Sequence, residues 1–195
     1  MKRPRRIFHK KRKGYSLAET LVSIFIITVI VGVLTSTLLV LLRSFVLYTT
    51  RNELLTDASR VTEQIGSIAR PAYGIEASRV ISGTTYTSDA TSLILKLASI
   101  NSAGEPIPSV FDYIVFLRDP NNQSTVLEIV DADPASVRAD RSQIIGHNVT
   151  DFALTYKQAT PVTSSNVYAT VTVAKKAGNV TPSFSLHVDA KLRNK

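Results

Sequence analysis

The chain has 195 residues, of which 44% are hydrophobic and 19% charged, so its composition is that of a folded protein rather than a disordered one. It contains no cysteine, which excludes disulfide bridges, thiolate metal sites and cysteine nucleophiles. The net charge is +8, but residues 1–14 hold eight of the 23 Lys and Arg, and the other 15 are balanced by 15 acids. This distribution argues against general nucleic-acid binding by residues 15–195, since that needs a local excess of positive charge.

An uncharged apolar run follows the basic block and covers residues 21–42, with the sequence LVSIFIITVIVGVLTSTLLVLL. As a helix it would be about 33 Å long, close to the thickness of the bilayer hydrocarbon. The rest of the chain is too short to enclose such a helix, so the run predicts a membrane span. The basic block predicts a cytoplasmic N-terminus, with the chain after about Arg43 outside the cytoplasmic membrane.

A secretory signal peptide is the alternative interpretation of this run. Its length exceeds the apolar stretch of about 7–15 residues that is typical of signal peptides. The small residues 35–37 are followed by LLVLL rather than by a polar cleavage region. We therefore expect the segment to remain in the protein as an anchor.

Glu19 lies two positions before the apolar run. A carboxylate deep in a bilayer costs about 2.5–3.5 kcal/mol, and near the interface the cost is lower. Taken alone, an acid at this point can simply complement the dipole of the first helical turn.

The segment KGYSLAETL, residues 13–21, resembles the class III prepilin signal of type IV pilins and type II secretion pseudopilins, and the resemblance extends over residues 10–43. It implies that a prepilin peptidase cleaves between Gly14 and Tyr15 and methylates the new N-terminus at Tyr15. It also implies that Glu19, the fifth mature residue, acts in subunit assembly. The sequence departs from the family in having Tyr where Phe is commoner and a long leader for a major pilin.

The chemistry of this segment agrees with the resemblance. Cleavage would remove eight positive charges and leave one amine at Tyr15, which the Glu19 carboxylate of a neighbouring subunit could meet. In a nonpolar setting such a pair offsets two desolvation costs. The partners implied by the resemblance are a prepilin peptidase, other pilin or pseudopilin subunits, an inner-membrane assembly platform and the lipid bilayer, whereas nucleic acid is not expected.

A second apolar pattern predicts that the helix continues beyond the membrane. Its residues recur at helical spacing with polar residues between them, and they are Leu54, Ala58, Val61, Ile65 and Ile68. Arg70-Pro71 should end the helix. We therefore expect a leader at residues 1–14, a long helix at 15–70 with its span at about 21–42, and a β-rich domain at 71–195.

The chain after Pro71 is rich in turn residues and in short alternating apolar runs. The predicted strands are Ser92–Leu97, Phe111–Arg118, Thr125–Val130, Val149–Tyr156, Val167–Ala174 and Phe184–Leu192. Alternation predicts an antiparallel sheet with one buried face, and residues 119–122 should form a turn between paired strands. The expected fold class is thus α+β, a long helix packed on an antiparallel sheet. The chain length and residues 148–156 and 192–194 resemble J-type pseudopilins or W-type minor pilins.

No catalytic residue, metal ligand or cofactor site is expected. The histidines His9, His147 and His187 lack the acid and histidine spacing of a metal site. Three acids, Asp131, Asp133 and Asp140, leave a calcium loop open as an alternative, although Pro134, Arg138 and Arg141 argue against it.

The leading interpretation is a non-enzymatic structural subunit, a minor pilin or pseudopilin. One alternative is a membrane-anchored module that binds DNA or a surface ligand, for which the only basic clusters are residues 138–141 and Lys175-Lys176. Another is an enzyme tethered by a signal anchor, which no sequence motif supports.

Overall fold

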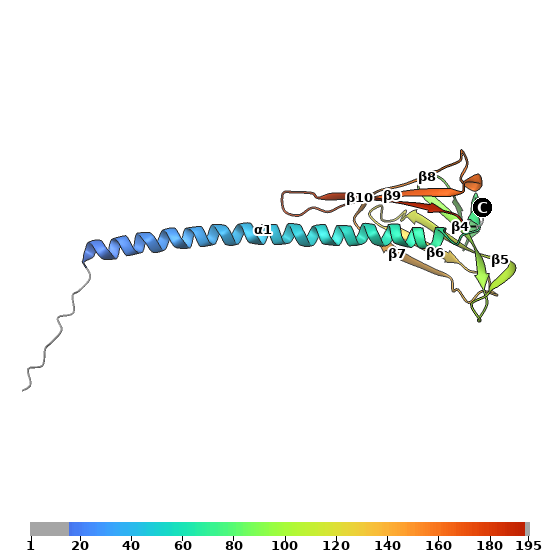
Figure 1. Cartoon of the computed structure of the whole chain (residues 1–195), viewed down its shortest axis with the longest axis horizontal. Coiled ribbons are helices and arrows are strands. Elements are labelled where there is room, and N and C mark those ends of the chain that lie inside the picture. The colour runs from blue at the N-terminus through green and yellow to red at the C-terminus, as the bar shows by residue number, and fades with distance from the viewer. Residues whose placement is uncertain (1–15, 194–195) are drawn as a thin grey trace, which may run out of the picture. The chain divides into compact units, whose positions relative to one another are not determined.

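A computed structural model describes residues 16–193 of the chain (Figure 1). The chain divides into two compact units, Met1–Phe45 and Val46–Lys195. The helix α1 (Leu17–Ala69) contributes residues to both units. It ends at Ala69, directly before Arg70-Pro71, as predicted. Its first residue is Leu17, whereas the sequence suggested Tyr15, which lies outside the described residues.

Residues 46–193 of the second unit contain ten strands, all paired antiparallel. A five-stranded sheet has the order β1 (Gly74–Ile75), β4 (Ser92–Ile100), β5 (Pro106–Arg118), β6 (Val126–Asp131) and β7 (Arg141–Gly146). A three-stranded sheet has the order β10 (Ser183–Lys191), β9 (Asn166–Ala174) and β8 (Val149–Tyr156). A separate hairpin pairs β2 (Ser78–Ile81) with β3 (Thr84–Thr87), and a short 3₁₀ helix η1 covers Pro161–Thr163. The α+β fold class is confirmed.

Each of the six predicted strands overlaps an observed one, and β8 has the predicted bounds. The sequence missed β1, β2, β3 and β7. β1 has only two residues, and β7 has only two large apolar side chains, so neither presents a clear alternating pattern. The turn between β5 and β6 is confirmed, because the amide of Asn121 donates to Asp119 Oδ1 at 2.8 Å.

One main core joins the second half of α1 to both larger sheets. Leu54, Ala58, Val61 and Ile65 are fully buried, as the helical spacing predicted, and Ile68 is half-buried against the same core. Figure 1 shows the later turns of α1 beside the strands of the second unit. Burial of a large apolar side chain contributes about 1.5–3 kcal/mol, so this stripe holds the helix on the sheets.

The contact between α1 and the end of β7 depends on a glycine. A Cβ atom at Gly146 would overlap Cγ2 of Val61. The absence of a side chain lets the strand end approach the helix closely. The neighbouring residue Asn148 has φ 56°, and its side-chain amide donates to Asp57 Oδ2 on the helix at 3.0 Å. The close approach at Gly146 and the hydrogen bond from Asn148 thus hold the connection from β7 to β8 against α1.

Candidate functional site

The N-terminus of α1 carries a reciprocal capping box. The amide of Glu19 donates to Ser16 Oγ at 3.2 Å, and the amide of Ser16 donates to Glu19 Oε2 at 3.2 Å. The carboxylate also lies in the first turn, where the helix dipole favours negative charge. These two hydrogen bonds therefore hold the Glu19 side chain against the first turn of α1. Gly14 and Tyr15, the predicted cleavage and methylation residues, lie outside the described residues.

The apolar part of α1 satisfies its polar side chains internally. The hydroxyls of Ser23, Thr28 and Thr35 each donate to a backbone carbonyl four residues earlier at 2.8 Å. Ser36 and Thr37 both donate to the carbonyl of Val33. None of these groups requires water, which suits a hydrocarbon environment. Among the described residues, α1 is the one helix long and apolar enough to cross a membrane.

The acidic stretch considered for calcium has protein partners instead. Asp131 accepts from Arg79 Nε at 3.0 Å, and Asp140 accepts from the amide of Ala132 at 2.7 Å. Asp133 accepts from the amide of Ala135 at 2.9 Å. Across residues 16–193, no three His, Asp or Glu side chains are grouped so that they could hold a metal ion.

Asp112 is the acid that organises this loop, and sequence reasoning overlooked it. Its buried carboxylate accepts from Ser99 Oγ at 2.6 Å, from the Asp133 amide at 2.9 Å, from Ser136 Oγ at 2.8 Å and from Arg138 Nη1. Burial by itself raises the pKa of Asp112, but these four donors together outweigh it and hold the pKa below its ordinary value. The signal in the sequence was a lone acid within the apolar run FDYIVF.

Glu128 is a second buried acid that the sequence analysis missed. It accepts from Gln64 Nε2 on α1 at 2.7 Å, from Arg141 Nη2 at 2.7 Å and from Gln143 Nε2 at 3.1 Å. The carboxylate therefore ties the helix to β6 and β7. The carboxylates of Asp112 and Glu128 thus both accept hydrogen bonds that hold the fold together.

Three residues of the two basic clusters have acidic partners. Arg138 pairs with Asp112, Arg141 pairs with Glu128, and Lys175 Nζ lies 2.7 Å from Glu53 Oε2. Nucleic-acid binding needs cations that are available to phosphates. At Arg138, Arg141 and Lys175 the positive charge is therefore shared with an acid of the chain itself.

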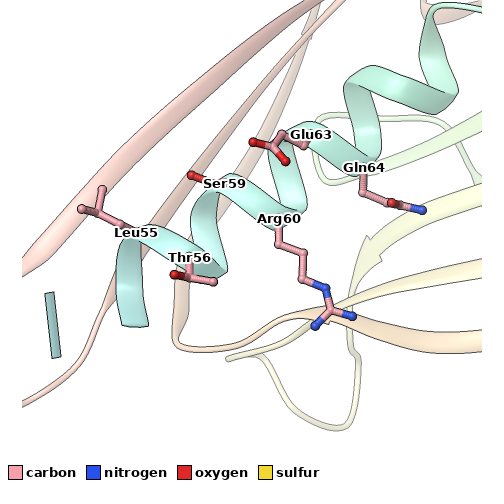
Figure 2. A pocket seen from close by; sticks show the side chains of 6 residues that line it. All are labelled: Leu55, Thr56, Ser59, Arg60, Glu63 and Gln64. Carbon is pink, nitrogen blue, oxygen red and sulfur yellow. The ribbon is translucent and has the colours of Figure 1, made fainter. Parts of the chain in front are cut away.

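Three surface depressions of the second unit have linings of mixed polarity. Figure 2 shows one whose six labelled side chains all come from α1, including Arg60 and Glu63. His147 lines another together with Asp57 and Lys175, and His187 lines a third beside Gly66. His9 lies outside the described residues. A depression walled by one helix face lacks the converging polar groups of a typical substrate site.

A family model for the prokaryotic N-terminal methylation motif matches residues 9–35. A comparison with curated proteins found no match. The matched residues contain the predicted cleavage point, Glu19 and residues 21–35 of the apolar run. This motif, together with the long apolar helix, indicates a prepilin-like protein that is anchored in a membrane. The chain therefore carries the class III signal sequence and the α+β architecture that are typical of type IV pilins and pseudopilins.

Proposed function

We propose that this chain is a minor pilin or pseudopilin subunit of a type IV pilus or of a type II secretion or competence pseudopilus. A prepilin peptidase cleaves it after Gly14 and methylates the amine of Tyr15. The processed subunit then joins the filament through the N-terminal part of α1. The observation that carries this proposal is the methylation motif at residues 9–35, which covers the end of the basic leader and the start of the apolar helix.

The exposed apolar surface of α1 supports a partner in the membrane or in a filament. Large side chains are exposed all around this segment, such as Phe25 at 68%, Leu34 at 63% and Leu41 at 61%. A helix that is apolar on every face must be covered by lipid or by other helices. Insertion in the bilayer before assembly and packing on neighbouring subunits afterwards both supply that cover.

Glu19 provides the charge for subunit registration. Its Oε2 is bound to the Ser16 amide, while Oε1 has no hydrogen bond to any of residues 16–193. In the proposed filament Oε1 accepts from the amine of Tyr15 on an adjacent subunit. Pairing the two charges offsets the desolvation of each in apolar surroundings.

The second unit, Val46–Lys195, which we call the β-rich unit, supports the role of a minor subunit rather than a major one. Its described residues form three sheets joined by irregular connections, such as those at 132–140 and 175–182. A major subunit would have to pack this surface repeatedly along a fibre, whereas a minor or tip subunit would not. We place the N-terminus in the cytoplasm and the β-rich unit outside the membrane, following the basic leader. The role is structural rather than enzymatic, and the J-type or W-type assignment stays a prediction.

The processing step is tested by mass spectrometry of the N-terminus in cells that contain a prepilin peptidase. We expect a mature chain that begins with methylated Tyr15. In a matched strain without the peptidase, the protein should retain residues 1–14. Retention of the leader in the peptidase-positive strain would contradict the proposal.

The assembly step is tested with two variants that separate the charge of Glu19 from its capping bond. Glu19→Gln keeps an oxygen for the Ser16 amide, because glutamine also serves in a capping box, but removes the charge. Ser16→Ala removes the hydroxyl cap and keeps the charge. We expect Glu19→Gln to be processed but excluded from sheared filaments, and Ser16→Ala to be incorporated. Equal incorporation of Glu19→Gln and wild type would refute the role of the charge.

A further inference from the structure

A pocket at the C-terminal end of α1 differs from the other depressions of the second unit. It has a volume of about 360 Å³ and adjoins Pro71, where the helix has just ended. Its lining includes Tyr73, Leu97, Ile100, Pro106, Arg138 and Arg193. We refer to it as the distal pocket. It combines an apolar lining with two guanidinium groups from separate parts of the chain.

Arg138 is held in the distal pocket by a buried network. Its Nη1 donates to the carbonyl of Ala98 at 2.7 Å and to Asp112. Asp112 is itself fully buried and is fixed by Ser99 and Ser136. The Nε and Nη2 of Arg138 make no hydrogen bond to any described residue, although the side chain lines the pocket. The arginine is thus positioned before any ligand arrives, which reduces the ordering cost of binding.

Arg193 supplies the second cation. Its amide donates to the carbonyl of Arg70 at 3.0 Å, which attaches Arg193 to the residue that directly follows α1. Within residues 16–193, no carboxylate lies within ion-pair distance of the Arg193 or Arg70 side chains. The nearby acid Asp112 is already neutralised by Arg138. Among residues 16–193, Arg193 therefore brings to the pocket a positive charge that has no matching acid.

An aromatic pair extends the pocket's edge. The rings of Tyr73 and Phe111 meet edge to face with centroids 5.5 Å apart, and Lys96 Nζ lies 4.1 Å from the centre of the Phe111 ring. Tyr73 is 45% exposed and lines the pocket. Tyr73 thus offers apolar contact inside the pocket, and its ring is held by Phe111 behind it.

We propose that the distal pocket binds an acidic segment of another protein, in which a carboxylate lies next to an apolar side chain. Guanidinium groups match carboxylates in geometry and charge, and the apolar lining takes the neighbouring side chain. The volume suits one or two side chains. A nucleic acid would instead need a row of available cations along a groove, which this compact site does not provide. The proposal concerns the far end of α1 and stands apart from assembly through Glu19.

The test is fluorescence anisotropy on the full chain in detergent micelles. The probe is a labelled peptide of sequence Gly-Ser-Leu-Asp-Ser-Gly with an amidated end, and its control replaces Asp with Asn. We expect saturable binding of the Asp peptide and about tenfold weaker binding of the Asn peptide, as befits loss of a charge-assisted hydrogen bond. This comparison leaves the protein unchanged, so folding does not enter.

A second arm changes the protein. Arg193→Gln should weaken the Asp peptide about tenfold, because it removes the exposed cation. Arg60→Gln, an exposed arginine on the α1 face of Figure 2, is the matched control and should bind as wild type does. Equal binding of the Asp and Asn peptides, no saturable binding, or unchanged binding by Arg193→Gln would overturn the proposal. So would a preference for single-stranded oligothymidine over the Asp peptide.

Discussion

The two parts of α1 have the same backbone but opposite relations to the rest of the molecule. Among residues 17–49, no side chain is buried, although most are apolar. From Thr50 to Ala69, buried residues recur at helical spacing, and at 61–62 and 65–66 two neighbours are both buried. The first part is apolar on all sides, whereas the second is apolar only toward the sheets.

This difference shows that one continuous helix can be specified for two environments. Helical hydrogen bonding is the same in lipid and in water, so the backbone need not change between them. The side chains decide which surroundings each part requires. The stability of the β-rich unit should therefore depend on the second part of α1 and be insensitive to the first.

The most direct way to break this comparison is a matched pair of leucine truncations. Leu54 is fully buried and Leu34 is 63% exposed. Leu54→Ala should destabilise the β-rich unit by about 2–5 kcal/mol through lost burial and a cavity. Leu34→Ala should leave it unchanged. The free energy of unfolding of each variant is measured by denaturant unfolding in detergent, with hydrogen exchange of the β4 and β9 amides as the readout. Similar losses in the two variants would show that the helix does not divide as described.

The buried network around Asp112 should give the next largest effect. Asp112→Asn removes the charge that Arg138 and the two serine hydroxyls face, which costs about 3 kcal/mol at neutral pH. Leu34→Asn is the matched exposed control. The same exchange experiment should show a lower free energy of unfolding for Asp112→Asn and an unchanged one for Leu34→Asn.

The dependence of stability on acidic pH gives a separate test of Asp112. Because its pKa in the folded protein lies below the ordinary value, the carboxylate stabilises the fold above about pH 4. This contribution is lost as the pH falls through the lowered folded pKa. Wild type should therefore lose more stability on acidification than Asp112→Asn does. Parallel pH profiles for the two proteins would argue that Asp112 is not ionised in the fold.

The close approach of Gly146 to Val61 sharpens the comparison further. Gly146→Ala should cost about 1–3 kcal/mol, since its Cβ overlaps Cγ2 of Val61. Adding Val61→Ala should recover part of that loss by removing the clashing methyl. Gly32→Ala is the control in the first part of α1, where a new Cβ meets nothing within 4 Å. A double variant less stable than predicted from the two single changes would contradict this packing.

The smallest expected effect concerns Tyr156. Its hydroxyl donates to the carbonyl of Asp89 at 2.8 Å, so Tyr156→Phe should cost about 1 kcal/mol at neutral pH. Burial, and secondly the charge of Asp89, raise the pKa of Tyr156 above its ordinary value of 10.0. The neutral hydroxyl thus stabilises the fold up to about pH 10, and this contribution is lost as the pH rises further. Tyr156→Phe should show a flatter alkaline profile, whereas Tyr168→Phe, a more exposed tyrosine, should follow wild type.

Local pattern predicted those elements whose side chains repeat regularly. The stripe from Leu54 to Ile65 and the stop at Arg70-Pro71 identified the second part of α1 and its end. Alternation located β8 and β9, because each has one face on the core. By contrast, β2 and β3 are short and largely exposed, so burial left no pattern in them.

Pairing across the chain was outside the reach of sequence reasoning. Arg138, between β6 and β7, and Arg141, on β7, form one basic cluster in the sequence, yet each meets a buried acid on β5 or β6. The distance in sequence between Gln64 and Glu128 likewise hides their contact. Such partners become visible only when β5, β6 and β7 lie side by side.

The sequence by itself determined the features that depend on neighbours along the chain: the basic leader, the methylation motif, the apolar run, and the helix with its end. Their chemistry acts over a few helical turns or against a uniform solvent such as lipid, so no fold is needed to read them. Tertiary structure alone decided the strand order, the partners of Asp112 and Glu128, and the convergence of Arg138 with Arg193. These depend on contacts between distant segments, which form only when burial of the shared core brings the segments together.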